Sequence, residues 1–134
     1  MPKEFDTETI HIINIFENLT GTEVKDCIIE GDTVYIGVEK GKVGYAIGKN
    51  GILIKRAEKA IRRNIKVFEF SDDLEEFVRN LIPMAKEVII KEDMVEVKVD
   101  KKDRPIVIGR DEKNLKIIKK LLERNHNIKN LIIR

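Results

Sequence analysis

The chain has 134 residues, of which 42% are apolar and 37% are charged. That charged fraction exceeds the roughly 25% of ordinary globular proteins, so a strongly ionic surface is expected around one ordinary domain or two very small ones. No run approaches the ~18 apolar residues of a membrane helix, and the acidic start MPKEFDTE lacks a signal peptide's apolar segment. A lone cysteine, Cys27, cannot form an internal disulfide, so we expect a cytoplasmic protein without membrane partners.

The net charge of +2 hides an uneven distribution. Residues 40–63 hold eight bases and one acid, a net of +7, and residues 101–134 hold eleven bases and four acids, again +7. Residues 1–32 hold two bases and eight acids, a net of −6. The two basic blocks would offer local footprints to a polyanion, although a solvated charged face explains such blocks equally well.

The first half of the chain predicts a helix, a hairpin, a glycine-rich segment, a helix and a strand. Ile10, Ile13 and Phe16 recur at helical spacing, which predicts a helix over residues 7–19 that ends near Gly21. The other predicted elements are a hairpin with strands at 24–29 and 34–38, a basic amphipathic helix from residue 53 that Asn64 closes, and a strand at 65–70.

The same order begins again after residue 70. Ser71, Asp72 and Asp73 predict the start of a helix that Pro83 limits, with Asp72 and Glu75 at capping-box spacing. The other predicted elements are strands at 88–90 and 95–99, a short apolar segment at 105–108, a helix at 115–122 and a strand at 128–133.

An internal repeat underlies this order. Ala46-Ile47-Gly48 matches Val107-Ile108-Gly109 at an offset of 61 residues. A repeated mixed α/β unit rarely arises by chance. The sequence therefore predicts an α+β protein with two consecutive domains, residues 1–71 and residues 72–134.

The glycine-rich stretch of the first unit carries the clearest chemistry. Gly48 and Gly51 enclose Lys49 and Asn50 just before a basic helix. Glycine lets another backbone approach closely, and free amides at a helix start favour a phosphate. Lys49 adds a cation, so the turn could hold a sugar-phosphate backbone and leave the bases to a neighbouring groove. A glycine turn that serves only helix packing is the alternative.

The matching turn of the second unit departs from this pattern. Gly109-Arg110-Asp111-Glu112 places an acid where the closing glycine should be. Carboxylates at a helix start can cap the helix, and they repel a phosphate. We therefore expect a weaker nucleic-acid contact here, or a purely structural, self-capped helix.

The segment from Ala46 to Arg56, AIGKNGILIKR, resembles the signature of a KH domain. The order helix-strand-strand-helix-helix-strand, with a three-stranded sheet backed by helices, resembles the type II form of that fold. Two such units in tandem resemble the archaeal NusA-like transcription factors, and VIGRDEKNLK at 107–116 resembles the second KH motif of NusA. The additional domains of the bacterial relatives do not fit in 134 residues.

The resemblance implies a protein that binds single-stranded, nascent RNA and takes part in controlling transcription termination or elongation. We expect RNA polymerase as a further partner and a monomeric protein. The candidate RNA-binding residues are Gly48, Lys49, Asn50, Gly51, Lys55, Arg56, Lys59, Gly109, Arg110, Lys113 and Lys116. A ribosome-associated or ribosome-assembly KH protein is the nearest alternative, and a protein-interaction module that has lost RNA binding is another.

Other chemistries find little support. Gly44 to Gly48 has three spacers where a P-loop needs four, and His11 and His126 have no ligand spacing. We predict no catalytic residues, no metal and no cofactor, and therefore not an enzyme. With five Phe, two Tyr and no Trp, aromatic stacking platforms are not expected. Bases would instead meet an aliphatic groove of Val43, Ala46, Ile47 and Ile54, unless these residues are simply core.

Overall fold

A computed structural model describes residues 4–134. Two compact units make up the chain, with the boundary between Ser71 and Asp72. Each unit is a mixed α/β structure with one three-stranded sheet, and each is described by itself below. No helix within residues 4–134 is long and apolar enough to cross a membrane.

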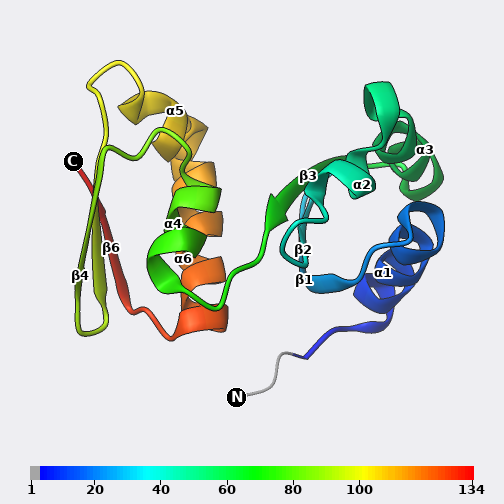
Figure 1. The fold of residues 1–134 in the computed structure, drawn as a ribbon, viewed down its shortest axis with the longest axis horizontal. Helices are drawn as coiled ribbons and strands as arrows, with labels where there is room; N and C mark the ends of the chain where they lie inside the picture. Colours follow the sequence, from blue (N-terminus) through cyan, green and yellow to red (C-terminus); the bar gives the residue numbers. More distant parts are fainter. Residues whose placement is uncertain (1–3) are drawn as a thin grey trace. The chain divides into compact units, whose positions relative to one another are not determined.

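The first unit places its helices against one face of its sheet (Figure 1). Its elements are α1 (Thr7–Thr20), β1 (Val24–Glu30), β2 (Thr33–Val38), α2 (Val43–Ile47), the 3₁₀ turn η1 (Lys49–Gly51), α3 (Ile52–Ile61) and β3 (Asn64–Glu69). Strand β2 is central, antiparallel to β1 and parallel to β3. The parallel pairing requires a crossover from β2 to β3, and α2, η1 and α3 form that crossover.

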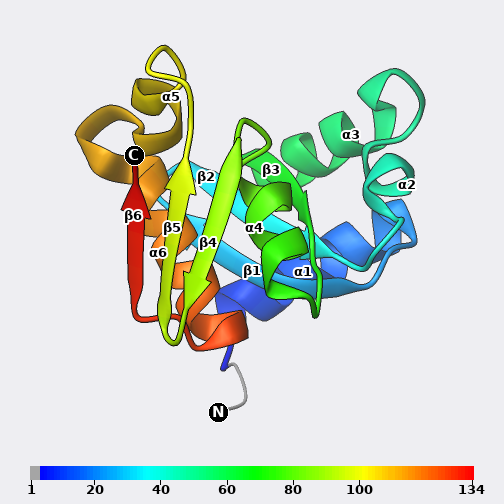
Figure 2. The ribbon, with the colours of Figure 1, turned by 60° about the vertical axis from the view of Figure 1, so that its left-hand side comes forward.

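The second unit repeats this order, and Figure 2 shows its three strands side by side. Its elements are α4 (Leu74–Leu81), β4 (Glu87–Lys91), β5 (Met94–Lys98), α5 (Arg104–Ile108), the 3₁₀ turn η2 (Arg110–Glu112), α6 (Lys113–His126) and β6 (Asn130–Ile133). Strand β5 is antiparallel to β4 and parallel to β6. The crossover again carries the glycine turn.

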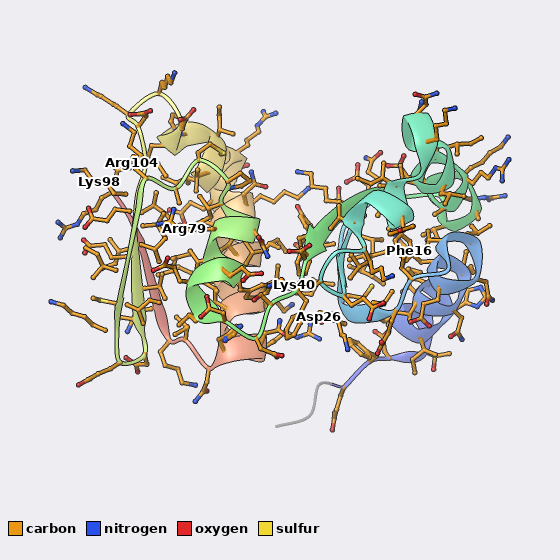
Figure 3. The ribbon with its side chains drawn as sticks, viewed as in Figure 1. Phe16, Asp26, Lys40, Arg79, Lys98 and Arg104 are labelled. Carbon is orange, nitrogen blue, oxygen red and sulfur yellow. The ribbon has the colours of Figure 1, made fainter. Side chains whose placement is uncertain are left out.

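Helix α1 forms where it is predicted, but its buried face only partly coincides with the predicted apolar stripe. Asp6 caps it by accepting a hydrogen bond from the Thr9 amide at 2.8 Å, and hydrogen bonds from Thr9 hold the pKa of Asp6 below its usual value. The buried positions are Thr9, Ile12, Phe16 and Thr20, and Phe16 points into the unit's interior (Figure 3). Ile10, by contrast, is 48% exposed. A spacing of three residues drifts around a helix of 3.6 residues per turn. Of the predicted positions, Ile13 and Phe16 therefore still contact the core, whereas Ile10 does not.

The core of the first unit lies between the sheet and its helices. Its fully buried members include Phe16 from α1, Val34 and Ile36 from β2, and Ala57 from α3. Cys27 belongs to the same cluster at 2% exposure, as expected for a cysteine inside an apolar run.

Two predicted helix boundaries are wrong by one or two residues. Helix α3 ends at Ile61 and is followed by the C-cap residue Arg62, which is left-handed at φ 64°. Asn64 therefore begins β3 instead of closing the helix. Helix α4 is capped by Asp73, which accepts a hydrogen bond from the Glu76 amide at 2.9 Å. The predicted capping pair Asp72 and Glu75 is therefore displaced by one residue.

Candidate nucleic-acid interface

The turn between α2 and α3 has a backbone that requires glycine. Gly48 lies at φ 78° and ψ 170°, a region that is essentially restricted to glycine. Asn50 and Gly51 are both left-handed, with φ of 56° and 72°. Asparagine and glycine tolerate this conformation best, so the sequence Gly-Lys-Asn-Gly matches the local geometry residue by residue.

The backbone hydrogen bonds of this turn do not involve the amides of Lys49 and Asn50. The Gly51 amide donates to the Gly48 carbonyl at 3.1 Å, and the Ile52 amide donates to the Lys49 carbonyl. The amides of Lys49 and Asn50 lie next to the start of α3, where unpaired amides and the helix dipole favour an anion.

Gly48 is also required by packing, whereas Gly51 is not. A Cβ added to Gly48 would lie 2.8 Å from Leu53 Cγ and 3.1 Å from Leu53 N, which is too close. A Cβ added to Gly51 would meet nothing nearer than 3.8 Å. The turn is therefore packed tightly onto α3 on the Gly48 side and is open on the Gly51 side.

The predicted cations of the first unit are all exposed, but they do not all lie at the turn. Lys49 belongs to the turn itself, and Lys55 Cε lies 3.8 Å from the position of a Gly51 Cβ. Arg56 is exposed on the following position of α3. Lys59 lies eight residues beyond Gly51, about 12 Å along the helix. The cations closest to the turn are thus Lys49 and Lys55.

Lys59 belongs to a different local environment. It lines a depression of about 370 Å³ near the end of α3, together with Asp32, Glu58, Arg62, Arg63 and Asn64. Arg63 in turn pairs with Glu8 at 2.6 Å. Because the lining charges are mixed and the carbonyl end of a helix repels anions, this depression is a poor site for phosphate.

The proposed aliphatic groove is mostly core. Ala46 is fully buried, and Val43 and Ile54 pack against the buried cluster of the first unit. Ile47 is half-buried. These side chains therefore hold α2 and α3 onto the sheet, and they offer little surface to a ligand.

Two large apolar side chains flank the turn, and neither of them was among the predicted site residues. Tyr45 on α2 is 67% exposed, and Ile52 at the start of α3 is 47% exposed. The Lys42 ammonium lies 4.9 Å from the centroid of the Tyr45 ring. A helix of five residues is too short for a 3.6-residue periodicity to show which of its apolar side chains face the core.

The backbone torsions of the second turn are nearly the same as those of the first. Gly109 has φ 77° and ψ 168°, Asp111 has φ 55° and ψ 30°, and Glu112 is left-handed at φ 62° and ψ 22°. Asn50 and Gly51 hold the corresponding places in the first turn. The turn geometry therefore survives the loss of the closing glycine.

Polar contacts support the second turn differently. Asn114 donates a hydrogen bond from Nδ2 to the Ile106 carbonyl at 3.0 Å, and a Cβ on Gly109 would come within 2.9 Å of the Asn114 side chain. The expected self-capping is wrong for Glu112, which occupies the N-cap of α6 without a side-chain capping bond. The predicted cations Arg110, Lys113 and Lys116 are exposed.

Replacing Glu112 with glycine is expected to stabilise the second unit. A side chain in the left-handed region costs about 1–2 kcal/mol, which the change to glycine removes. Glycine is more flexible in the unfolded chain, and this reduces the gain in stability by about 0.5–1 kcal/mol. A net gain of about 0.5–1 kcal/mol should raise the melting temperature by about 3–6 °C, measured by thermal unfolding. RNA affinity should also rise, because a carboxylate leaves the turn.

Asn127→Gly is the matched control for this variant. Asn127 is also left-handed, at φ 58°, but it ends α6 far along the helix from the turn. It should change stability without changing RNA affinity. A lower melting temperature for Glu112→Gly would contradict the strain argument, and unchanged affinity would contradict the electrostatic one.

Within residues 4–134, no group of three or more His, Cys, Asp and Glu side chains could hold a metal ion. The site consists instead of a glycine turn, exposed cations and two exposed apolar side chains.

A glycine turn between two helices that back a three-stranded sheet is the arrangement of a KH domain. Residues 12–72 match the family model of the KH domain, so the first unit is a KH domain in sequence as well as in form.

Comparison with whole proteins places the chain more narrowly. It is 34% identical over 128 residues to the "probable transcription termination protein NusA" of Methanocaldococcus jannaschii, which covers 91% of this chain and 70% of that protein. The protein of the same name from Halococcus morrhuae is 32% identical over 92% of this chain and 91% of its own length. The chain therefore belongs to the family of archaeal NusA-like transcription termination proteins.

A solved structure agrees with this assignment. The crystal structure of APE1850 is similar with a TM-score of 0.80 at 32% sequence identity. The similarity covers 97% of this chain and 100% of that chain, so it includes residues of both units.

Proposed function

We propose that this protein binds single-stranded RNA through the turn at residues 48–51 and thereby acts in transcription termination or elongation. The observation that carries the proposal is the turn itself, in which a glycine-dependent backbone presents the amides of Lys49 and Asn50 beside two exposed lysines. The KH match over residues 12–72 and the names of the relatives support the same conclusion.

The second unit is proposed to be a KH domain of the same type II form, in tandem with the first. Its support is the identical element order, the same strand pairing and the matching torsions of the two turns. Its turn carries Asp111 and Glu112 in place of Asn50 and Gly51, so it would be the weaker RNA contact.

The proposed mechanism is a grip on the backbone. A KH domain clamps about four nucleotides. One phosphate would accept hydrogen bonds from the free amides of the turn, and Lys49 and Lys55 would neutralise it and its neighbour. A nascent transcript held in this way could be presented to RNA polymerase at a pause or terminator.

The direct test is a titration with a short single-stranded RNA and with the duplex of the same sequence. Binding should favour the single strand and weaken with salt, with a slope of about −0.7 per neutralised phosphate. Two or three contacts predict a total slope of about −1.4 to −2. Fluorescence anisotropy at several salt concentrations measures both. Absence of binding to the single strand would contradict the proposal and leave a protein-interaction module.

Capture of partners from cell extract tests the transcriptional part. Tagged protein should retain RNA polymerase subunits after nuclease treatment of the extract. Recovery of small-subunit ribosomal proteins in their place would contradict the transcription role and favour the ribosome-associated alternative.

A further inference from the structure

The most exposed large apolar side chains of residues 4–134 occupy equivalent positions in the two units. Tyr45 is 67% exposed and Ile106 is 61% exposed, and no other large apolar residue in this range exceeds 48%. Each lies three residues before the first glycine of its turn, Gly48 or Gly109. An isolated exposed apolar residue is ordinary, but its recurrence at the same position beside each turn indicates a feature that each unit has on its own surface.

Tyr45 lies on α2, the helix that leads directly into the turn. It precedes Gly48, the C-cap residue of α2, by three residues. The Gly48 amide closes the last turn of α2 by donating to the Gly44 carbonyl at 3.0 Å. The Tyr45 backbone therefore lies within one helical turn of the place where the proposed phosphate would be held.

Lys42 contacts the Tyr45 ring, but the ring stays largely exposed to solvent. Its ammonium lies over the ring, 4.9 Å from the centroid. A cation in this position attracts the electron-rich face of an aromatic ring and leaves the opposite face to solvent. The pair thus offers a flat apolar surface with a positive charge beside it, which suits a nucleobase attached to a phosphate.

We propose that Tyr45 stacks on a nucleobase of the RNA strand whose phosphate is held by residues 48–51. The inference deepens the proposed function and rests on it. Ile52, 47% exposed just after the turn, would contact the same base or the next one. An aromatic ring stacks on any base because every base has a π face, so Tyr45 supplies affinity without a sequence preference.

The second unit has no ring at this position. Ile106 gives an aliphatic contact only, and Lys113 takes the place of Ile52. The two units would therefore differ in how they hold RNA, with base stacking in the first and a weaker, mainly electrostatic contact in the second.

Tyrosine fluorescence can report the stacking directly. The chain has two tyrosines and no tryptophan. Tyr35 is only 7% exposed, and its buried hydroxyl has no hydrogen-bond partner within residues 4–134. Tyr35→Phe should therefore cost little stability and leave Tyr45 as the single fluorophore. In this variant, titration with a short single-stranded RNA should quench most of the tyrosine emission in step with binding; unchanged emission at saturating RNA would overturn the inference.

RNA affinities of Tyr45 variants provide a second test of the stacking. Tyr45→Ala should weaken binding by about 5–100-fold, the equivalent of the ~1–3 kcal/mol of base–aromatic stacking, whereas Tyr45→Phe should bind as the parent does. Ile10→Ala, which truncates an exposed apolar residue on α1, is the matched control and should change nothing. The slope of affinity against salt should stay the same in Tyr45→Ala, because no charge has been removed.

An RNA with abasic positions separates this inference from the proposed function. Such a strand keeps its phosphates, so it should bind the parent more weakly and should be indifferent to Tyr45→Ala. If intact RNA binds with the expected salt dependence but Tyr45→Ala has no effect, the stacking is overturned and the grip at residues 48–51 stands. If no single-stranded RNA binds at all, the proposed function itself has failed.

Discussion

Replacing Gly48 with alanine is expected to destabilise the first unit by about 1.5–5 kcal/mol. The conformation at φ 78° and ψ 170° costs a side chain about 1–3 kcal/mol. The added Cβ would also come within 2.8 Å of Leu53 Cγ, and overpacking of this kind costs about 1–3 kcal/mol. Alanine loses less conformational entropy than glycine on folding, which offsets about 0.5–1 kcal/mol of these costs. Urea unfolding followed by circular dichroism would measure the loss, and RNA affinity should fall as well because the turn must change shape.

Two further glycines serve as a graded control. Gly44 lies within α2 with open space around it, so Gly44→Ala should stabilise the unit by about 0.5–1 kcal/mol. Gly51 is left-handed but unobstructed. Gly51→Ala should therefore cost only about 0.5–1 kcal/mol, because the left-handed penalty of about 1–2 kcal/mol is partly offset by the smaller conformational entropy that alanine loses on folding. Equal effects at the three positions would contradict the assignment of separate torsional and packing requirements.

The glycine turn was the most predictable part of the site. Spacing alone placed Gly48 and Gly51 at a bend before a basic helix, and the torsions agree because only glycine adopts φ 78° with ψ 170° at low cost. The hairpin strands were equally readable, since Val34, Ile36 and Val38 alternate and are all fully buried.

The predictions were wrong where the local sequence allows more than one structure, at the N-cap of α4 and on the buried face of α1. Asp72 and Asp73 are both acceptable N-cap residues, and the entry of the chain into α4 selects Asp73. In α1 a run of apolar residues allows several stripes, and the sheet determines that Ile12 is buried and Ile10 exposed. Neither choice is encoded by residues within one turn of the helix.

The second turn shows what composition alone cannot decide. Glu112 replaces the closing glycine of the pattern, yet the torsions of Gly109, Asp111 and Glu112 match those of the first turn. Tertiary context holds a non-glycine residue in the left-handed region there. The sequence indicated the change in charge correctly, but the retained shape required coordinates. Tyr45 was missed for a related reason, because exposure depends on which face of a five-residue helix meets the sheet.

Changing Lys49 and Asn50 together to aspartate is expected to weaken RNA binding by about 30–100-fold at low salt. The variant removes a charge-assisted contact of about 1.5–3 kcal/mol and places two carboxylates beside the proposed phosphate. The salt slope should become shallower by about 0.7 per lost phosphate contact. The fold should persist, because Asp111 already adopts φ 55° at the place equivalent to Asn50.

The matched control makes the same two substitutions elsewhere. Lys91 and Asn130 are exposed on the sheet of the second unit, and their replacement by aspartate changes the net charge equally without touching either turn. Arg110→Asp gives a further comparison, with an expected loss of only about threefold because acids already surround that position. If the sheet variant loses as much affinity as the Lys49 and Asn50 variant, binding depends on overall charge. The specific grip at residues 48–51 would then be rejected, and the exposed amides of the turn would have no part in holding RNA.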